Sequence, residues 1–231
     1  MQSAMGSDPV KIMIKNIKTL ANMNDESISV EMKLESLENL SDFCEDIDLA
    51  SGLSQFKIRT KYNLICYILK FVLCLDFYKI GGFALFESLL QSESSAIRAA
   101  TCHLIATIVQ NNPYCQKIAL QDNLMTSLLS SLSQDPSEQV QVKALYAISC
   151  LVREDEAAQE AFLKADGLSH VMRVLQSDVT LDKLHVKAAF LVSNLAKSSD
   201  KIAGKFCDSN QVDKILFIHN LTLGAIFRCS V

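Results

Sequence analysis

A short segment recurs three times in this chain and limits what the chain can fold into. Each copy has an apolar residue at both ends and a polar or helix-breaking stretch between them, at residues 77–83, 162–168 and 206–212. The helical patterns that precede the copies align with offsets of 43 and 44 residues. Repeats of this length are typical of helical solenoids, which stack similar units and expose long surfaces.

The longest helix of each unit carries the same apolar stripe. With Ala100, Lys143 and Lys187 in register, apolar or small residues follow one, four, five and eight positions later. This spacing is the buried face of an amphipathic helix. The aligned sets are Thr101, Ala144 and Ala188; Leu104, Ala147 and Leu191; Ile105, Ile148 and Val192; and Ile108, Leu151 and Leu195. We therefore predict units of a short first helix, a second helix and a long third helix.

The turns between these helices carry their own signals. A polar residue followed by Pro, as in Asn112-Pro113 and Asp135-Pro136, predicts an N-cap and the first helical residue. Gly82 and Gly167 predict left-handed turns at helix ends. Second helices are predicted at residues 83–91, 124–132 and 168–176.

The composition agrees with an all-α fold. Apolar residues make up 49% and aromatic residues 7% of the 231 residues, with no Trp and 3 Pro. These values suit packed helices of Leu, Ala, Ile and Val. The prediction is one elongated domain, an all-α solenoid of three-helix repeats.

A distance of 19 residues separates the start of a third helix from the next repeated segment, as from Lys143 to Phe162. If residues 33–44 are an earlier third helix, the distance from Lys33 to Phe77 is 44 residues, an excess of 25. Removing residues 51–75 restores the spacing. This block is a translated intron or splice insertion, a genuine insertion helix, or a membrane element. Its apolar run at 62–75 is shorter than the roughly 20 residues that a span needs.

These spacings divide the chain into five segments. They are an amino-terminal segment at 1–24, partly helical because residues 10–17 are amphipathic; a first helical unit at 25–50; the atypical insertion at 51–75; repeats at 76–219; and a truncated last repeat at 220–231.

Charge and cysteine usage exclude several classes of protein. The formal net charge of −4 gives no general attraction to nucleic acid. The eight cysteines are scattered without a CxxC pair, which predicts buried thiols in a reducing compartment. Residues 1–18 show no secretory signal, so we expect a cytoplasmic protein, with no membrane partner.

No pattern indicates catalysis. The chain contains no GxxxxGK[ST], GxGxxG, HExxH or GxSxG motif. The four histidines lack metal-ligand spacing, and the acidic residues 154–156 are typical of a charged helix end. We predict that the chain is not an enzyme and needs no cofactor or metal.

The third helices present a candidate binding surface on the side away from the core. Stacking places equivalent residues side by side, which predicts a basic and aromatic surface on the concave face for an acidic protein partner. The candidate residues are Lys143, Tyr146, Cys150 and Arg153 in one unit and Lys187, Phe190, Asn194 and Lys197 in the next. Their counterparts one unit earlier are Ala100, His103, Thr107 and Gln110. Alternatively, the charges are a solvated helix face and the two rings pack against neighbouring units.

The sequence resembles a known family. The run KAAFLVSNL at 187–195 resembles the third helix of the armadillo repeat. With VKALYAISCLVRE at 142–154 and FLKADG at 162–167, it is similar to the armadillo-type nucleotide exchange factors of 70-kilodalton heat-shock chaperones, nearest to the cytosolic heat-shock-protein-binding branch. The likeness covers residues 31–50 and 76–217.

The resemblance implies an armadillo-like, right-handed superhelical solenoid. Its concave surface is expected to bind the chaperone ATPase domain and to promote ADP release, and we expect a monomer. The alternative is a general armadillo adaptor for an extended peptide or another protein partner.

Overall fold

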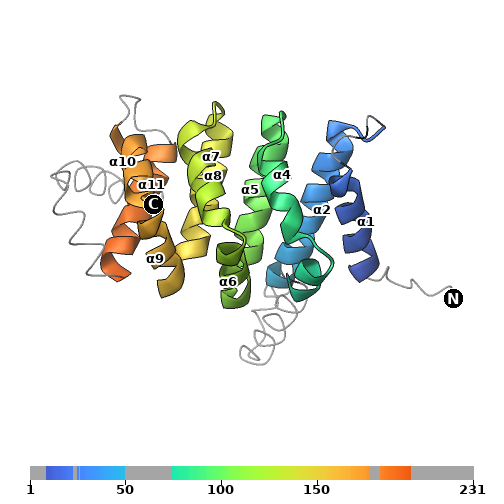
Figure 1. Cartoon of the computed structure of the whole chain (residues 1–231), viewed down its shortest axis with the longest axis horizontal. Coiled ribbons are helices and arrows are strands. Elements are labelled where there is room, and N and C mark those ends of the chain that lie inside the picture. The colour runs from blue at the N-terminus through green and yellow to red at the C-terminus, as the bar shows by residue number, and fades with distance from the viewer. Residues whose placement is uncertain (1–8, 23–24, 26, 50–73, 177–182, 199–231) are drawn as a thin grey trace, which may run out of the picture.

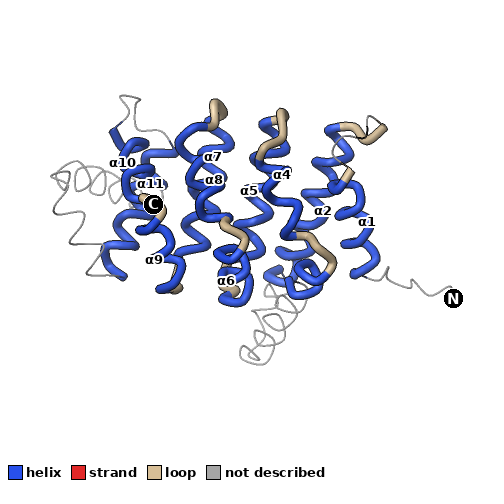
Figure 2. Tube along the Cα trace, viewed as in Figure 1, coloured by secondary structure: helices blue, strands red, loops and turns tan. Residues whose placement is uncertain are grey.

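The computed structural model describes residues 9–22, 25, 27–49, 74–176 and 183–198. Every regular element in these ranges is a helix, which confirms the all-α prediction. Figure 1 shows the helices side by side in one row from α1 to α11, and Figure 2 shows the loops that join them. The elements are α1 (Pro9–Ala21), α2 (Val30–Leu49), a helix at 74–79, η2 (Phe83–Leu85), α4 (Phe86–Leu90), α5 (Ser95–Val109), α6 (Pro113–Gln121), α7 (Leu124–Gln134), α8 (Glu138–Val152), α9 (Glu156–Lys164), α10 (Gly167–Gln176) and α11 (Lys183–Ser198).

Helices of the same kind form rows that run along the molecule. The third helices α2, α5, α8 and α11 contact one another in succession, and so do the second helices α4, α7 and α10. The first helices α6 and α9 contact each other as well. The predicted second helices and the amphipathic helix at 10–17 are confirmed by α4, α7, α10 and α1. Each unit buries its apolar face against its neighbours, as expected for a solenoid.

The register of α2 differs from the sequence prediction by three residues. Its buried stripe has the same spacing as that of α8, so Lys33 corresponds to Val140 and Ser36 to Lys143. The two stripes are Lys33, Leu37, Leu40, Ser41 and Cys44, and Val140, Ala144, Ala147, Ile148 and Leu151. The prediction that Lys33 matches Lys143 is therefore wrong. Polar residues at buried positions of α2 hid its core face in the sequence.

The corrected register changes the length of the extra segment. Ser36 lies 41 residues before Phe77, so the excess over the repeat spacing is 22 residues rather than 25. The predicted block at 51–75 also overlaps the helix at 74–79, where Cys74 is completely buried. Its Sγ donates to the carbonyl oxygen of Ile108 over 3.8 Å. The rest of the block, the third repeated segment at 206–212 and the truncated repeat at 220–231 lie outside the described residues.

The two repeated glycines are required for a different reason from the one predicted. Gly82 has an ordinary φ of −62°, and the left-handed residue is the one before it, Gly81, with φ of +84°. A Cβ at Gly82 would lie 2.4 Å from the Phe77 ring. Likewise, a Cβ at Gly167 would lie 2.3 Å from the Phe162 ring. Close approach of an aromatic ring, not backbone conformation, therefore selects glycine here.

One of the two predicted caps is confirmed and the other is wrong. Asn112 caps α6, because its side chain accepts a hydrogen bond from the backbone N–H of Cys115 over 3.2 Å. Asp135 instead lies at the end of α7, and α8 begins two residues later than predicted, after Ser137. Asp135 Oδ1 accepts from the Ser137 N–H over 2.9 Å, which shapes the turn between the two helices.

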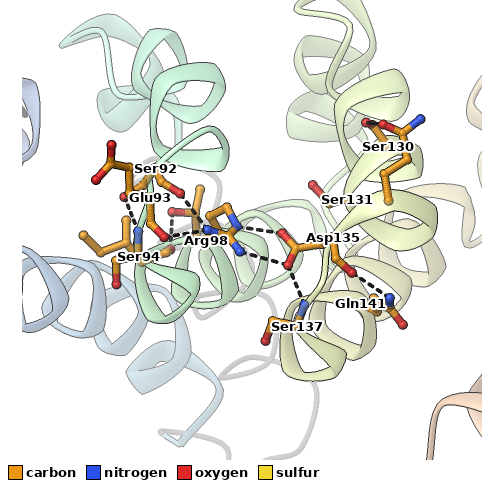
Figure 3. Close-up of polar contacts among 12 residues, drawn as sticks. Ser92, Glu93, Ser94, Arg98, Ser130, Ser131, Asp135, Ser137 and Gln141 are labelled. Atoms are coloured by element: carbon orange, nitrogen blue, oxygen red, sulfur yellow. Dashed lines mark hydrogen bonds and ion pairs between the residues drawn. The ribbon is translucent and has the colours of Figure 1, made fainter.

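Asp135 is engaged by an arginine from the preceding unit. Arg98 on α5 donates from Nε and Nη2 to the two carboxylate oxygens of Asp135, over 2.6 and 2.9 Å. Arg98 Nη1 also donates to the carbonyl oxygens of Ser92 and Glu93. Figure 3 shows this network, in which one guanidinium joins the turn before α5 to the turn before α8.

Candidate functional site

The predicted residues come from three successive third helices, so neighbouring helices bring them together. We call their outward positions the third-helix surface, defined by the four positions of each of α5, α8 and α11. These are Ala100, His103, Thr107 and Gln110; Lys143, Tyr146, Cys150 and Arg153; and Lys187, Phe190, Asn194 and Lys197. Because α8 contacts both α5 and α11, equivalent residues on the three helices lie in rows across this surface.

Most of the eight candidate residues are accessible. Arg153, Lys187, Asn194 and Lys197 are exposed, and Lys143 and Tyr146 are half-buried. Phe190 is 51% exposed, which is unusual for a ring of this size. These seven residues are therefore available to a partner in the described part of the chain.

Cys150 is the exception, and its prediction as a surface residue is wrong. It is 1% exposed, and its counterpart Thr107 is 3% exposed. Each belongs to a helix that contacts a third helix on both sides. Asn194 on α11, the last described third helix, is exposed at the same level.

Tyr146 is the centre of contacts between the three third helices. The Nζ atom of Lys187 lies 5.8 Å from the centroid of the Tyr146 ring, which is a cation–π geometry. The Tyr146 hydroxyl donates to Oε1 of Gln110 over 3.4 Å. The ring of His103 lies 6.4 Å from that of Tyr146, centroid to centroid. The predicted basic and aromatic residues are thus in contact across helix boundaries.

A pocket between the end of α8 and α11 brings together three further candidates. Arg153, Phe190 and Asn194 line it, and its volume is about 410 Å³. The remaining lining residues are Ser149, Val152, Glu154, Gln159, Leu191, Leu195 and Ser198. Lys143 and Lys197 are not among the residues that line it.

Buried glutamines fix the carboxyl end of α8 beside this pocket. Gln116 Nε2 on α6 donates to the carbonyl oxygens of Leu151 and Arg153, over 2.9 and 3.0 Å. Gln159 Nε2 on α9 donates to the carbonyl oxygen of Val152 over 3.2 Å. These bonds satisfy carbonyl groups that a helix end leaves without partners. The backbone of Arg153 is therefore held while its side chain remains exposed.

The described part of the chain holds its thiols in the interior. Burial raises the pKa of the Cys102 thiol to about 12, so it stays protonated at neutral pH. The described cysteines, Cys44, Cys74, Cys102, Cys115 and Cys150, are all buried. Within the described ranges, no group of His, Cys, Asp and Glu is arranged to hold a metal ion. None of the helices described here combines the length and the apolar content that crossing a bilayer requires.

Several residues of the site were not among the eight candidates selected from the sequence. His103 and Gln110 contact Tyr146 or hydrogen-bond to it, and the alignment of the third helices already marked them as counterparts of candidate residues. Ser149 and Ser198 line the pocket but belong to neither predicted row. Their contribution depends on how α8 and α11 pack, which no spacing within one helix reveals.

Residues 74–216 match the model of the SIL1/FES1/HPBP1 C-terminal domain family. The chain belongs to this family. The match includes α5, α8 and α11, so the family region contains the whole third-helix surface, and the resemblance inferred from residues 142–195 is confirmed.

Curated relatives of the SIL1/FES1/HPBP1 C-terminal domain family extend the match. Hsp70-binding protein 1 of Homo sapiens is 29% identical over 231 residues, covering 96% of this chain and 56% of that protein. Hsp70-binding protein 1 of Rattus norvegicus is 33% identical over 205 residues, covering 85% of this chain and 50% of that protein. The Hsp70 nucleotide exchange factor FES1 of Saccharomyces cerevisiae is 27% identical over 190 residues, covering 81% and 57%. The chain spans about half the length of the curated relatives it matches.

Solved structures confirm the armadillo fold of this family member. A designed armadillo repeat protein in complex with the peptide (KR)4 has a TM-score of 0.60 at 14% identity, covering 92% of this chain and 98% of that chain. A computationally designed armadillo repeat protein for modular peptide recognition also has a TM-score of 0.60, at 16% identity, covering 92% and 99%. The armadillo-like solenoid is therefore shown.

Proposed function

We propose that this chain is a co-chaperone that binds the ATPase domain of a 70-kilodalton heat-shock chaperone through the third-helix surface and promotes ADP release. The observation that carries the proposal is the family match over residues 74–216. Relatives that align with most of this chain are named Hsp70-binding protein 1 and Hsp70 nucleotide exchange factor FES1. The exposed basic and aromatic residues of α8 and α11 support the third-helix surface as the contact.

The proposed mechanism needs no catalytic residue. A protein that binds the ADP-free form of the chaperone more tightly than the ADP-bound form must weaken ADP binding by the same factor. A tenfold preference corresponds to about 1.4 kcal/mol. The helix end fixed by Gln116 and Gln159 gives this surface the rigidity needed to favour one conformation of the partner.

Release of a fluorescent ADP analogue from the chaperone tests the proposal. We expect the chain to accelerate release, and a chain without residues 51–72, which keeps the helix at 74–79, is measured beside it. Changing Lys143, Arg153, Lys187 and Lys197 together to Glu is expected to abolish both binding and acceleration. Because exposed substitutions typically change stability by less than about 0.5 kcal/mol each, the melting temperature should change little.

The matched control places the same charge change elsewhere. Lys79, Lys117, Lys164 and Arg173 are exposed residues on first and second helices. Changing these four to Glu alters the net charge equally, yet should leave ADP release unaffected. If neither the full chain nor the shortened one accelerates release, the proposed exchange activity is wrong. If both quadruple variants lose binding equally, the contact is not specific to the third-helix surface.

We further propose that the protein acts as a monomer in the cytoplasm. The burial of the five described cysteines supports a reducing compartment. Sedimentation of the purified chain and fractionation of cells measure these two properties.

The alternative of an adaptor for an extended peptide has weaker support. To bind an extended peptide, an adaptor needs hydrogen-bonding groups at regular intervals along the peptide backbone. Thr107 and Cys150, at equivalent positions of α5 and α8, are buried, and the Thr107 hydroxyl donates to the His103 carbonyl oxygen. The described third helices α5 and α8 therefore offer no exposed hydrogen-bonding side chain at this position.

A further inference from the structure

The pocket between α8 and α11 has an apolar interior and a polar rim. Val152, Leu191 and Leu195 line it and are nearly fully buried, at 2, 3 and 2% exposed. The ring of Phe190 forms part of its wall and is half exposed. The volume of about 410 Å³ lies at the small end of the range for ligand pockets. The pocket therefore suits side chains of a partner protein.

Arg153 and Asn194 on the rim can recognise a carboxylate, beside the acidic Glu154. The Arg153 guanidinium makes no ion pair with another described residue, and the side chain of Asn194 forms no hydrogen bond with one. α11 contains Lys183, Lys187 and Lys197 and no acidic residue. Glu154 is the acidic residue in the lining. Arginine can bind a carboxylate through two parallel hydrogen bonds, which gives both strength and geometry.

The negative end of the α8 dipole does not cancel the attraction between Arg153 and a carboxylate. The carbonyl oxygens of Leu151 and Arg153 accept hydrogen bonds from Gln116, and that of Val152 accepts one from Gln159. The partial charge of the helix end is thereby largely compensated. The helix end therefore adds little repulsion to a carboxylate that approaches the Arg153 guanidinium.

We infer that this pocket is the anchor point of the interface and that it receives an apolar side chain of the chaperone ATPase domain. Arg153 and Asn194 then hold a carboxylate beside that side chain. The inference rests on the proposed function and adds the chemistry of the partner's contact. Anchors of this kind, with an aromatic residue and an arginine around a desolvated pocket, carry most of the affinity in many interfaces.

The test is the dissociation constant between the full chain and the isolated ATPase domain of a 70-kilodalton heat-shock chaperone. Phe190→Ala removes the wall, Arg153→Met removes the guanidinium but keeps an unbranched side chain, and Asn194→Asp repels a carboxylate. We expect each to weaken binding by at least about tenfold, and truncation of a hot-spot residue costs about thirtyfold or more. The loss caused by Arg153→Met should shrink as salt rises, because screening weakens the contact in the unmodified chain.

Two control variants change equally exposed residues away from the pocket. Met32→Ala removes a side chain that is 48% exposed on α2, and Arg173→Met removes an exposed guanidinium on α10. Both should bind within about twofold of the unmodified chain, as expected for residues outside an interface. If the unmodified chain does not bind, the proposed function fails with the inference. If it binds, and the three pocket variants bind equally well, only the pocket inference is overturned.

Discussion

The pair formed by an aromatic residue and a glycine five residues later shows how single residues compensate one another between repeats. Phe162 packs against Gly167 in one unit, whereas Ala119 and Leu124 occupy the equivalent places one unit earlier. The side chains of Phe162, Ala119 and Leu124 are nearly fully buried. The small and the large residue have exchanged places, which conserves the volume of the core. Cores tolerate such exchanges better than uncompensated changes.

This exchange predicts strong coupling between two substitutions. Gly167→Leu alone should lower the free energy of unfolding by about 1–3 kcal/mol through overpacking, and Phe162→Ala alone by about 3–5 kcal/mol. The double variant reproduces the Ala119 and Leu124 arrangement and should be at least about 1 kcal/mol more stable than additivity requires. Urea unfolding of the four proteins measures the coupling. Additive losses would show that the two residues do not share one space.

A second prediction at this scale concerns pH. Burial, and then the nearby Arg173, lower the pKa of His170, with Asp166 acting in the opposite direction. Its Nδ1 forms a 2.8 Å hydrogen bond with Ser133 Oγ on α7. Because the folded chain binds this proton less tightly than the unfolded chain, stability should fall as pH drops below the ordinary histidine value of about 6.5. Urea unfolding at about pH 7.5 and 5.5 should show a smaller difference for His170→Gln than for the unmodified chain. Equal differences would contradict the assignment.

Between elements, the contact of Arg98 with Asp135 connects consecutive units through their turns. The side chains are 13% and 6% exposed, so both charges are largely withdrawn from water. Burial alone raises the pKa of Asp135, but hydrogen bonds from Arg98 and the Ser137 N–H outweigh this and hold that pKa below its usual value. The carboxylate is thus stabilised in its charged form by the fold.

Breaking this contact should be costly. Asp135→Ala leaves the guanidinium with carbonyl partners but no counter-charge, and we expect a loss of about 2–4 kcal/mol, near the range for buried pairs. The exposed pair of Lys164 and Glu160, 3.4 Å apart, provides the control. Glu160→Ala should cost less than about 1 kcal/mol. The two variants are compared by chemical unfolding, and similar losses would contradict the structural role given to Asp135.

The same contact sets a pH dependence. The lowered pKa of Asp135 means that its stabilisation is present above the unfolded value of 3.8 and is lost as pH falls through the folded pKa. Unfolding followed from about pH 5 to pH 3 should therefore show a steeper decrease for the unmodified chain than for Asp135→Asn. Parallel curves would show that another carboxylate dominates.

Over the whole molecule, the two ends of the third-helix layer differ in charge. The exposed side of α2 carries Glu31, Glu35, Glu38 and Asp42, whereas α11 carries lysines and no acid. Glu38 corresponds in register to Cys102, Leu145 and Ala189, which are buried against neighbouring helices. Among the described residues no third helix precedes α2, so its outer side meets water. Terminal repeats of solenoids typically need such a polar outer face.

The polar outer side of α2 predicts which substitutions cause the chain to self-associate. Changing Glu38 and Asp42 to Leu should give α2 an apolar edge like that of the internal repeats and cause concentration-dependent oligomers. Analytical ultracentrifugation measures this. The same two changes at Glu156 and Glu160, exposed on α9, are the control and should cause less association. A monomeric double variant at the concentration limit would argue against the capping role of α2.

Much of the fold followed from local patterns. The apolar stripes of α5, α8 and α11 and the Asn112 cap were predictable because each depends on neighbours within one helix. The third-helix surface was partly predictable for the same reason, since Tyr146 and Phe190 occupy equivalent positions, as do Lys143 and Lys187. The register of α2 was missed because Lys33, Ser36 and Ser41 are polar yet buried. Cys150 was misplaced because its burial comes from the adjacent helices.

The sequence by itself determined the repeat, the all-helical class and the order of helices, since helix periodicity and turn chemistry act over a few residues. Only the tertiary structure decided which outward residues remain accessible, that Arg98 contacts Asp135, and that Arg153, Phe190 and Asn194 share one pocket. Arg98 and Asp135, and likewise Arg153 and the two α11 residues, are 37–41 positions apart in the chain. Their physical basis is the packing of one repeat on the next, which fixes distances that no single helix encodes.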